Sequence, residues 1–216
     1  MSIKDYSGIK MPKGRPKLTK EASDSRKREI ISIAKRLFVE NGYQSVSMRK
    51  IASVAGLSPM MLYKSFENKR DLLRFIWTDI FVEVSNQCNR ALETQNSDSE
   101  KLYAFCDAFL QYWLRHPEHY RVVYLESDQL EGKGDSYFAD EAVIQELFTQ
   151  LGELVQNLSN EGVDVDLKVK LLVLQLQGIA HGLIVISEIP WGSHQSLLSS
   201  CLQAFERSLI CSEVTA

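Results

Sequence analysis

Residues 46–73 (VSMRKIASVAGLSPMMLYKSFENKRDLL) contain three helix starts in close succession, and this crowding limits the folds open to the chain. Ser47, Ser58 and Asn68 are residue types that cap helix N-termini, and Pro59 suits the first position of a helix. A helix of two turns is marginal in isolation. The first two helices must therefore be held by packing, which leaves their outward side chains available for another role.

Apolar side chains fix how the two short helices meet. Val46 can contact Ile51, and Leu57 can contact Leu62, as hydrophobic staples at the two starts. A helix, a tight glycine-containing turn and a second helix form the helix-turn-helix pattern, whose second member enters the major groove of DNA. The expected inward residues, packed on a preceding helix over residues 23–41, are Ile51, Ala52, Ala55, Leu57, Leu62 and Phe66. The expected outward residues are Met60, Met61, Tyr63, Lys64 and Ser65.

The charge of the chain is divided sharply along its length. Residues 1–80 hold 17 lysine and arginine residues against 8 acidic ones, and residues 81–216 hold 8 against 20. A basic segment of this kind is typical of a surface that meets a polyanion. Lys69 and Arg70 lie in the first turn of the third helix, where the helix dipole disfavours cations. A docked phosphate would explain them.

The segment RKREIISIAKRLFVENGYQSVSMRKIASVAGLSPMMLYKSFENKRDLL resembles the DNA-binding domain of the TetR family of bacterial transcriptional regulators. The matching motifs are LFVENGY, SMRKIASVAGLS, LYKSF and NKRDLL. The resemblance implies an all-α protein with an N-terminal three-helix DNA-binding domain and a larger helical domain for effector binding and dimerisation. We expect a flexible basic arm over residues 1–20, the DNA-binding domain over 21–70 and the second domain over 71–216.

The same resemblance assigns roles at the DNA. It places Ser47, Tyr63 and Lys69 on backbone phosphates, and Arg49 would pair with a guanine edge. The arm would enter a narrow minor groove. Ser65 departs from the histidine or aromatic residue frequent in the family. The residues expected at the DNA are Lys13, Arg15, Lys17, Ser47, Arg49, Lys50, Ser58, Pro59, Met60, Met61, Tyr63, Lys64, Ser65 and Lys69.

The remaining chain predicts helices over residues 69–95, 99–116, 117–129, 140–160, 164–187 and 193–211. The His181-Gly182-Leu183 segment resembles a C-terminal domain common in the family, although Gln177 or a neighbour stands where the family usually has tryptophan. The last two helices are the expected dimer interface. The apolar run over residues 167–189 is interrupted by charged and polar residues, which favours a heavily buried helix over a membrane span.

Aromatic residues of the middle helices predict an effector cavity. Aromatic side chains at helical spacing are also the ordinary content of a core, and a lone histidine on an apolar face is usually a core residue, so both interpretations stay open. The expected ligand-binding residues are Phe109, Trp113, Tyr124, Phe148 and His181.

The sequence indicates a cytoplasmic protein. It also indicates a regulator rather than an enzyme, because it carries no nucleophile elbow, metal motif or phosphate loop. We expect no cofactor and no metal; His116 and His119 are interpreted as solvent-facing, and the cysteines as reduced and mostly buried. The predicted partners are a palindromic operator in double-stranded DNA, a second copy of the chain and a small apolar or amphipathic effector that releases a repressor. The alternative is a DNA-bound adaptor whose acidic second domain grips a partner protein.

Overall fold

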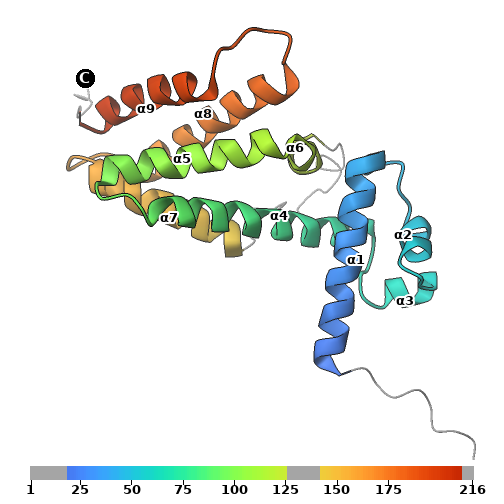
Figure 1. Ribbon diagram of the computed structural model, residues 1–216. Helices are drawn as coiled ribbons and strands as arrows, with labels where there is room; N and C mark the ends of the chain where they lie inside the picture. Colours follow the sequence, from blue (N-terminus) through green and yellow to red (C-terminus); the bar gives the residue numbers. More distant parts are fainter. Residues whose placement is uncertain (1–18, 126–141, 211–216) are drawn as a thin grey trace, which may run out of the picture.

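The computed structural model describes residues 19–125 and 142–210, and every regular element in these two ranges is a helix (Figure 1). Residues 1–18 of the predicted arm, with Lys13, Arg15 and Lys17, lie outside the described residues, and its last two residues instead cap and begin the first helix. The helices are α1 (Lys20–Asn41), α2 (Met48–Val54), α3 (Pro59–Tyr63), α4 (Lys69–Leu92), α5 (Asp98–Arg115), α6 (Pro117–Tyr124), α7 (Ala142–Leu158), α8 (Val165–Val185) and α9 (His194–Ile210).

The reading head, defined here as residues 19–68 with the first turns of α4, has the predicted caps. The Ser47 hydroxyl accepts a hydrogen bond from Lys50 N at 3.2 Å, and the Ser58 hydroxyl accepts one from Met61 N at 3.3 Å. Helix α1 begins at Lys20, three residues before the predicted start, because Thr19 caps it. The N-terminus of each short helix is therefore capped by the serine that precedes it, as the sequence predicted.

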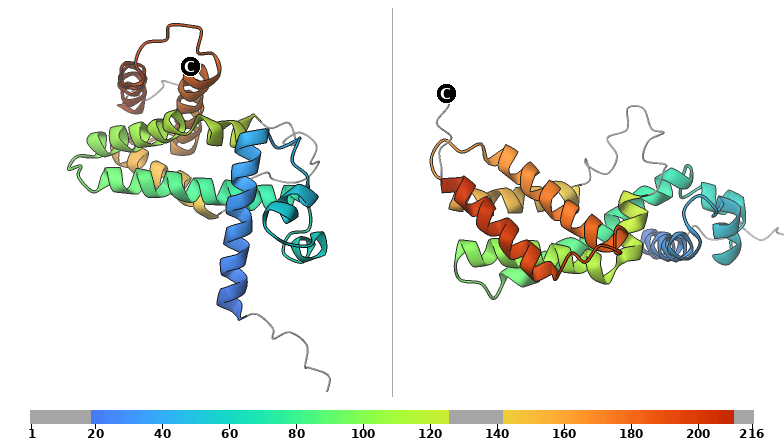
Figure 2. Two further views of the ribbon diagram at one scale, coloured as in Figure 1. Left: turned by 45° about the vertical axis from the view of Figure 1, so that its right-hand side comes forward. Right: turned by 90° about the horizontal axis from the view of Figure 1, so that it is seen from above.

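Helix α4 joins the head to the rest of the molecule. Asn68 caps it by accepting from Asp71 N at 2.8 Å, as predicted. Figures 1 and 2 show α1 lying across the first part of α4, while the later part of α4 runs beneath the second domain. Its buried residues continue along its whole length: Leu72, Leu73, Ile76, Trp77, Ile80, Phe81, Val84, Ser85 and Cys88. The buried residues of the head and of the second domain thus form one continuous core, and α4 belongs to both parts of it.

In the second domain, α5 packs on α4, α7, α8 and α9, and α8 also packs on α7 and α9. Figure 2 shows α8 and α9 side by side on one side of the bundle. Cys88 and Cys106 are buried free thiols, and burial raises the pKa of Cys88 to about 12. This helical second domain agrees with the expected fold class.

The expectation of a heavily buried helix at residues 167–189 is wrong. Helix α8 buries Val169, Leu172, Leu176 and Ala180, whereas Leu167, Leu171 and Leu174 are exposed. By length and composition it is apolar enough to cross a membrane, but only 28% of its most apolar 18-residue window is buried in the chain. Because one stripe packs within the bundle, the helix has an apolar face that a single copy leaves uncovered.

Candidate DNA-reading surface and effector cavity

Helix α3 turns one side chain inward and presents the rest. Leu62 is fully buried, whereas Met60 is 73% exposed and Tyr63 is 52% exposed. The helix has five residues, begins at Pro59 and ends at Tyr63. Met60, Met61 and Tyr63 are exposed together on this one helix, which follows the turn after α2, so α3 has the form of a recognition helix.

Most of the predicted DNA contacts form one exposed set on α2, α3 and their flanks. Arg49 and Lys50 are exposed in the first turn of α2, beside the cap residue Ser47. The exposed members among the described residues are Ser47, Arg49, Lys50, Ser58, Pro59, Met60, Met61, Tyr63, Lys64 and Ser65. The arrangement offers hydroxyls and cations for phosphates around an apolar centre that can enter a groove.

Lys69 has a structural role that the sequence did not reveal. Its ammonium donates to the Tyr43 carbonyl at 2.8 Å and lies 3.9 Å from the centre of the Tyr43 ring. Tyr43 is buried and packs edge-on against Phe38. Lys69 therefore ties the start of α4 to the loop after α1, and a phosphate contact remains a prediction. The tyrosine of the ENGY segment was the sequence feature from which this contact with Lys69 could have been predicted.

A small cavity of about 90 Å³ lies among α4, α5, α7 and α8 and the end of α6. Three of the predicted ligand-binding residues, Phe109, Tyr124 and Phe148, line it. Trp113 does not; it lies one layer behind, with its ring edge-on to those of Phe109 and Tyr124. The full lining is Phe81, Phe105, Phe109, Tyr124, Ile144, Leu147, Phe148, Leu151, Val173, Leu176 and Gln177.

His181 is also absent from the lining, although it was predicted there. Its Nδ1 lies 3.4 Å from the Tyr120 hydroxyl, on the side of α8 that faces α6. Gln177, one turn earlier on the same helix, is the residue of α8 that brings a polar group to the cavity. Sequence reasoning had noted Gln177 only as a departure from the family, because neither its burial nor its neighbours follow from spacing alone.

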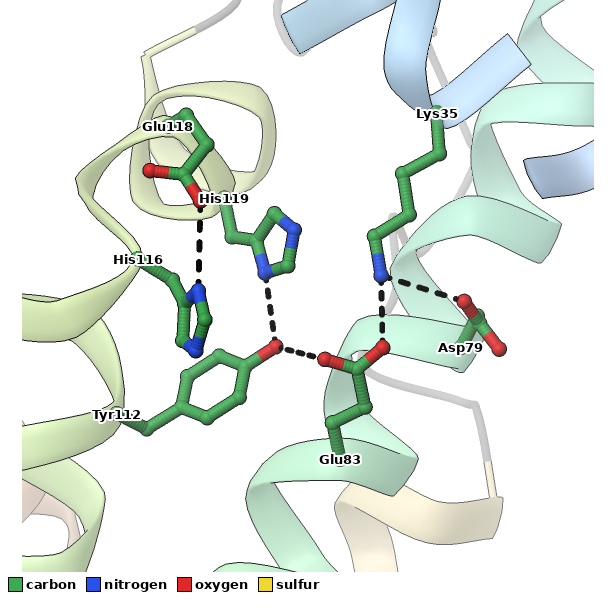
Figure 3. Close-up of polar contacts among 7 residues, drawn as sticks. All are labelled: Lys35, Asp79, Glu83, Tyr112, His116, Glu118 and His119. Atoms are coloured by element: carbon green, nitrogen blue, oxygen red, sulfur yellow. Dashed lines mark hydrogen bonds and ion pairs between the residues drawn. The ribbon is translucent and has the colours of Figure 1, made fainter. Parts of the chain in front are cut away.

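A polar network joins the head to the second domain (Figure 3). Lys35 of α1 donates to Glu83 of α4 at 2.8 Å and also pairs with Asp79 at 3.4 Å. The Tyr112 hydroxyl of α5 lies 2.7 Å from the other Glu83 oxygen and 2.8 Å from His119 Nδ1 of α6. Four helices therefore meet through side chains that sequence analysis did not connect.

The network sets the protonation of its members. Burial would raise the pKa of Glu83, but hydrogen bonds from Lys35 and Tyr112, with the charge of Lys35, lower it overall. Burial and the Lys35 charge lower the pKa of His119 to about 4. Burial and the neighbouring Glu83 carboxylate raise the pKa of Tyr112. At neutral pH Glu83 is thus ionised, and the Tyr112 proton is directed to it, which makes His119 Nδ1 the donor to Tyr112.

The expectation that both neighbouring histidines face solvent is wrong for His119, which is buried. His116, Glu118 and His119 bring three possible metal-ligating atoms within 4.8 Å of one another. However, the two imidazole rings are stacked with 16° between their planes, so their in-plane lone pairs do not converge on one point. The arrangement fits a packed polar cluster better than a metal centre.

Comparison with known sequences matches both domains. Residues 30–76 match the family described as bacterial regulatory proteins of the tetR family, and residues 102–188 match the tetracyclin repressor-like C-terminal domain. The activator FasR of Mycolicibacterium smegmatis is 27% identical over 101 residues, which cover 47% of this chain and 46% of FasR. The Staphylococcus aureus regulator SAR2658 is 29% identical over 134 residues, which cover 61% of this chain and 67% of that protein. The chain thus spans about half the length of FasR.

Solved structures show the same fold. A Rhodococcus sp. RHA1 protein of unknown function aligns with a TM-score of 0.70 and 17% identity, covering 93% of this chain and 99% of that one. The fatty acid degradation regulator FadR of Bacillus halodurans aligns with a TM-score of 0.61 and 18% identity, covering 83% and 94%. The family consists of transcriptional regulators rather than enzymes. With both domain models matched and the helix-turn-helix surface in place, the chain belongs to the TetR family of DNA-binding transcriptional regulators.

Proposed function

We propose that the protein is a cytoplasmic, homodimeric repressor that leaves a palindromic operator when a small apolar or amphipathic molecule binds the second domain. The observation that carries this proposal is the placement of α4. Its capped start lies in the reading head at Lys69, and its residue Phe81 lines the cavity. A change in cavity shape therefore acts on the helix that positions the DNA-reading surface.

The exposed face of the head supports the DNA part of the proposal. Arg49 is exposed in the first turn of α2, from which it would reach a base edge. Tyr63 and Lys64 are exposed at the end of α3, where they would contact phosphates. The lysines and arginines of the head supply the salt-dependent share of affinity that any DNA-binding surface needs.

The uncovered face of α8 supports dimerisation. Leu171 is 43% exposed and Leu174 is 63% exposed on α8, and Ile210 is 60% exposed at the end of α9. Two helices from each copy would form a four-helix interface with two-fold symmetry. A dimer of this kind reads a palindrome with half-sites about 34–36 Å apart, or a multiple of that spacing.

A ligand can shift the protein between two head spacings only by binding one of them more tightly. The network of Figure 3 provides a route for this shift, because Lys35 ties α1 to α4 while Tyr112 and His119 tie α4 to α5 and α6. A displacement of α4 at the cavity is thereby transmitted to α1 as well as to the capped start at Asn68.

The adaptor alternative rests on the same apolar stripe of α8, which would then receive a different protein. The mass of the purified protein in solution distinguishes the homodimeric repressor from the adaptor. A dimer at micromolar concentration covers the stripe with a second copy, whereas a monomer leaves it for another partner.

The DNA surface is tested with duplexes selected from a random pool. We expect Tyr63→Phe to weaken binding by about fivefold, the effect of one lost hydrogen bond, and Lys64→Ala to reduce the dependence on salt by about one phosphate contact. Tyr103→Phe, the same chemical change at a half-buried tyrosine of α5 outside the head and the cavity lining, is the control and should bind DNA like the unmodified protein. Unchanged affinity in both head variants would contradict the proposed surface.

A further inference from the structure

The cavity is lined without charge. Its wall consists of aromatic and aliphatic side chains with the Tyr124 phenol and the Gln177 amide, and the described lining includes no aspartate, glutamate, lysine, arginine or histidine. An ion moved into such surroundings loses its hydration and gains no counter-charge, at a cost of several kcal/mol or a shift to its neutral form. The wall therefore selects against a ligand that buries a charged group.

The amide of Gln177 is a polar group placed at this wall and not used by the fold. The residue is half-buried on α8, between the buried residues Leu176 and Ala180 of the same helix. Within the described part of the chain, no residue donates to its side chain or accepts from it. An amide offers both donors and an acceptor, so it can pair with a hydroxyl, a carbonyl or an ether.

A second unused donor lies one layer behind. Trp113 is fully buried, and its indole Nε1 has no hydrogen-bond partner among the described residues. Its ring lies edge-on to Phe81, Phe109 and Tyr124, three residues of the cavity wall. An unpaired buried donor costs stability, and such groups in native proteins call for an explanation such as a functional role. The Gln177 amide is therefore the group at the wall that can pair with a neutral polar group of a ligand, and the unpaired Trp113 N–H lies behind the aromatic rings of the wall.

The size of the cavity limits the molecule further. At about 90 Å³ it is smaller than the engineered apolar cavity of about 150 Å³ that holds one benzene ring. Phe148 lines the cavity and is also 41% exposed, so its ring lies at the boundary with solvent. A rotation of this ring into solvent would widen the cavity without moving a buried side chain.

We infer that the cavity takes an uncharged, mainly apolar molecule, with the girth of one aromatic ring or a short alkyl chain, whose neutral polar group is held by Gln177. This inference rests on the proposed function, because it names the class of effector for the same cavity. It also narrows the proposed class of effectors, because an amphipathic molecule fits only if its charged group stays outside the cavity.

The test compares molecules of one shape and different charge. Benzyl alcohol, benzoate and benzylammonium are titrated into the purified protein at pH 7, and binding is followed by calorimetry and by the methyl and aromatic NMR signals of the lining residues. We expect benzyl alcohol to bind at least about tenfold more tightly than either ion, because each ion loses hydration that the wall does not replace. Equal or tighter binding of benzoate, or no binding of benzyl alcohol, would overturn the inference.

The role of Gln177 is tested with Gln177→Leu and toluene. This variant should bind benzyl alcohol about three- to tenfold more weakly, the effect of a lost hydrogen bond, and toluene equally or more tightly. Gln156→Leu, which changes an exposed glutamine of α7, is the matched control and should leave both affinities unchanged. If Gln177→Leu also leaves both unchanged, Gln177 does not hold the ligand.

Duplex binding is measured in the same preparations without any probe. Retained duplex binding with failed probe binding would refute the ligand class alone. Absence of duplex binding together with selective binding of benzyl alcohol would refute the regulatory role. The inferred ligand class of the cavity would then still hold.

Discussion

The reading head and the second domain are both helical, but their helices are determined in different ways. In the head, α2 has seven residues and α3 has five, and each begins at a serine that accepts a hydrogen bond from the backbone three residues later. In the second domain, α8 has 21 residues and α9 has 17. Asp164 and Ser193 cap their starts in the same way, but burial along these longer helices is what holds them together. Contacts between residues close in sequence thus shape the DNA-reading surface, whereas packing between distant segments shapes the cavity.

This difference has a functional consequence. A short, capped helix keeps its outward side chains in fixed positions, as recognition of base edges requires. The cavity wall instead combines residues as distant along the chain as Phe81 and Gln177. Small shifts between long helices change the shape of this wall without breaking a cap. The molecule therefore places its rigid part at the DNA and its adaptable part at the ligand.

The largest effect is expected where the head relies on packing. Leu62 is the one buried residue of α3. Leu62→Ala should cost about 2–5 kcal/mol of head stability and abolish duplex binding. Hydrogen exchange should then show the amides of α1 to α3 opening while those of α5 and α8 stay protected.

Met60→Ala is the matched control for this variant. Met60 is 73% exposed, so its truncation should change stability by at most about 0.5 kcal/mol while still weakening duplex binding. Equal loss of protection in both domains of Leu62→Ala would show that the head and the second domain unfold as one unit, and the comparison drawn above would fail.

How much the sequence predicts follows the same division. Every cap proposed from residue type in the head is present, and the outward set on α3 is exposed, because these features depend on residues three or four positions apart. The cavity was predicted in kind but not in detail. Phe109 lines it, whereas Trp113 lies behind the wall and His181 faces Tyr120, since helix rotation within a bundle does not follow from composition.

The link between the regions was missed altogether by sequence reasoning. Lys35, Glu83 and Tyr112 come from three helices, and nothing in their spacing indicates that they meet. The last two helices were expected to form the dimer interface, but the side chains of α8 that face outward could not be identified for a related reason. An apolar run has the same composition whether it packs within its own chain or against another copy, so only the placed neighbours show that Leu174 is exposed.

The polar network that joins the head to the second domain predicts a dependence of stability on pH. The folded pKa of His119 is about 4, lowered by burial and by Lys35, whereas an unfolded histidine titrates near about 6.5. Between these values the unfolded chain binds a proton that the folded chain does not. Stability is therefore complete above about pH 6.5 and falls as the pH drops toward 4, by about 1–2 kcal/mol after allowance for partial solvent access.

His119→Asn should flatten urea midpoints across this pH window, and His116→Asn, the neighbouring histidine, should leave most of the slope in place. Glu83→Gln acts in a lower window, because the lowered pKa of Glu83 makes its contribution disappear only below about pH 4.3. An unchanged slope in His119→Asn would assign the dependence to other groups.

A smaller effect separates the two buried tryptophans. Trp77 donates its indole N–H to the Val122 carbonyl at 3.2 Å, which ties α4 to α6, whereas the Nε1 of Trp113 has no partner among the described residues. Replacing each by phenylalanine removes the same volume, but only Trp77→Phe also removes a hydrogen bond. We expect Trp77→Phe to be the more destabilising by about 1 kcal/mol in urea titrations. A larger loss in Trp113→Phe would show that its N–H is already paired, which would remove one support for the ligand class.

The smallest effect on stability tests whether a cap and a DNA contact are separable at Ser47. Its hydroxyl accepts from Lys50 N at 3.2 Å, and the sequence also places it at a phosphate. Ser47→Ala should lower stability by about 1 kcal/mol and weaken duplex binding. Ser47→Asp keeps the cap and favours the helix N-terminus, so stability should stay within about 0.5 kcal/mol, yet its charge repels phosphate and should reduce duplex affinity more than alanine does. If the aspartate variant bound duplex like the unmodified protein, Ser47 would serve the fold alone, and the reading surface would begin at Arg49.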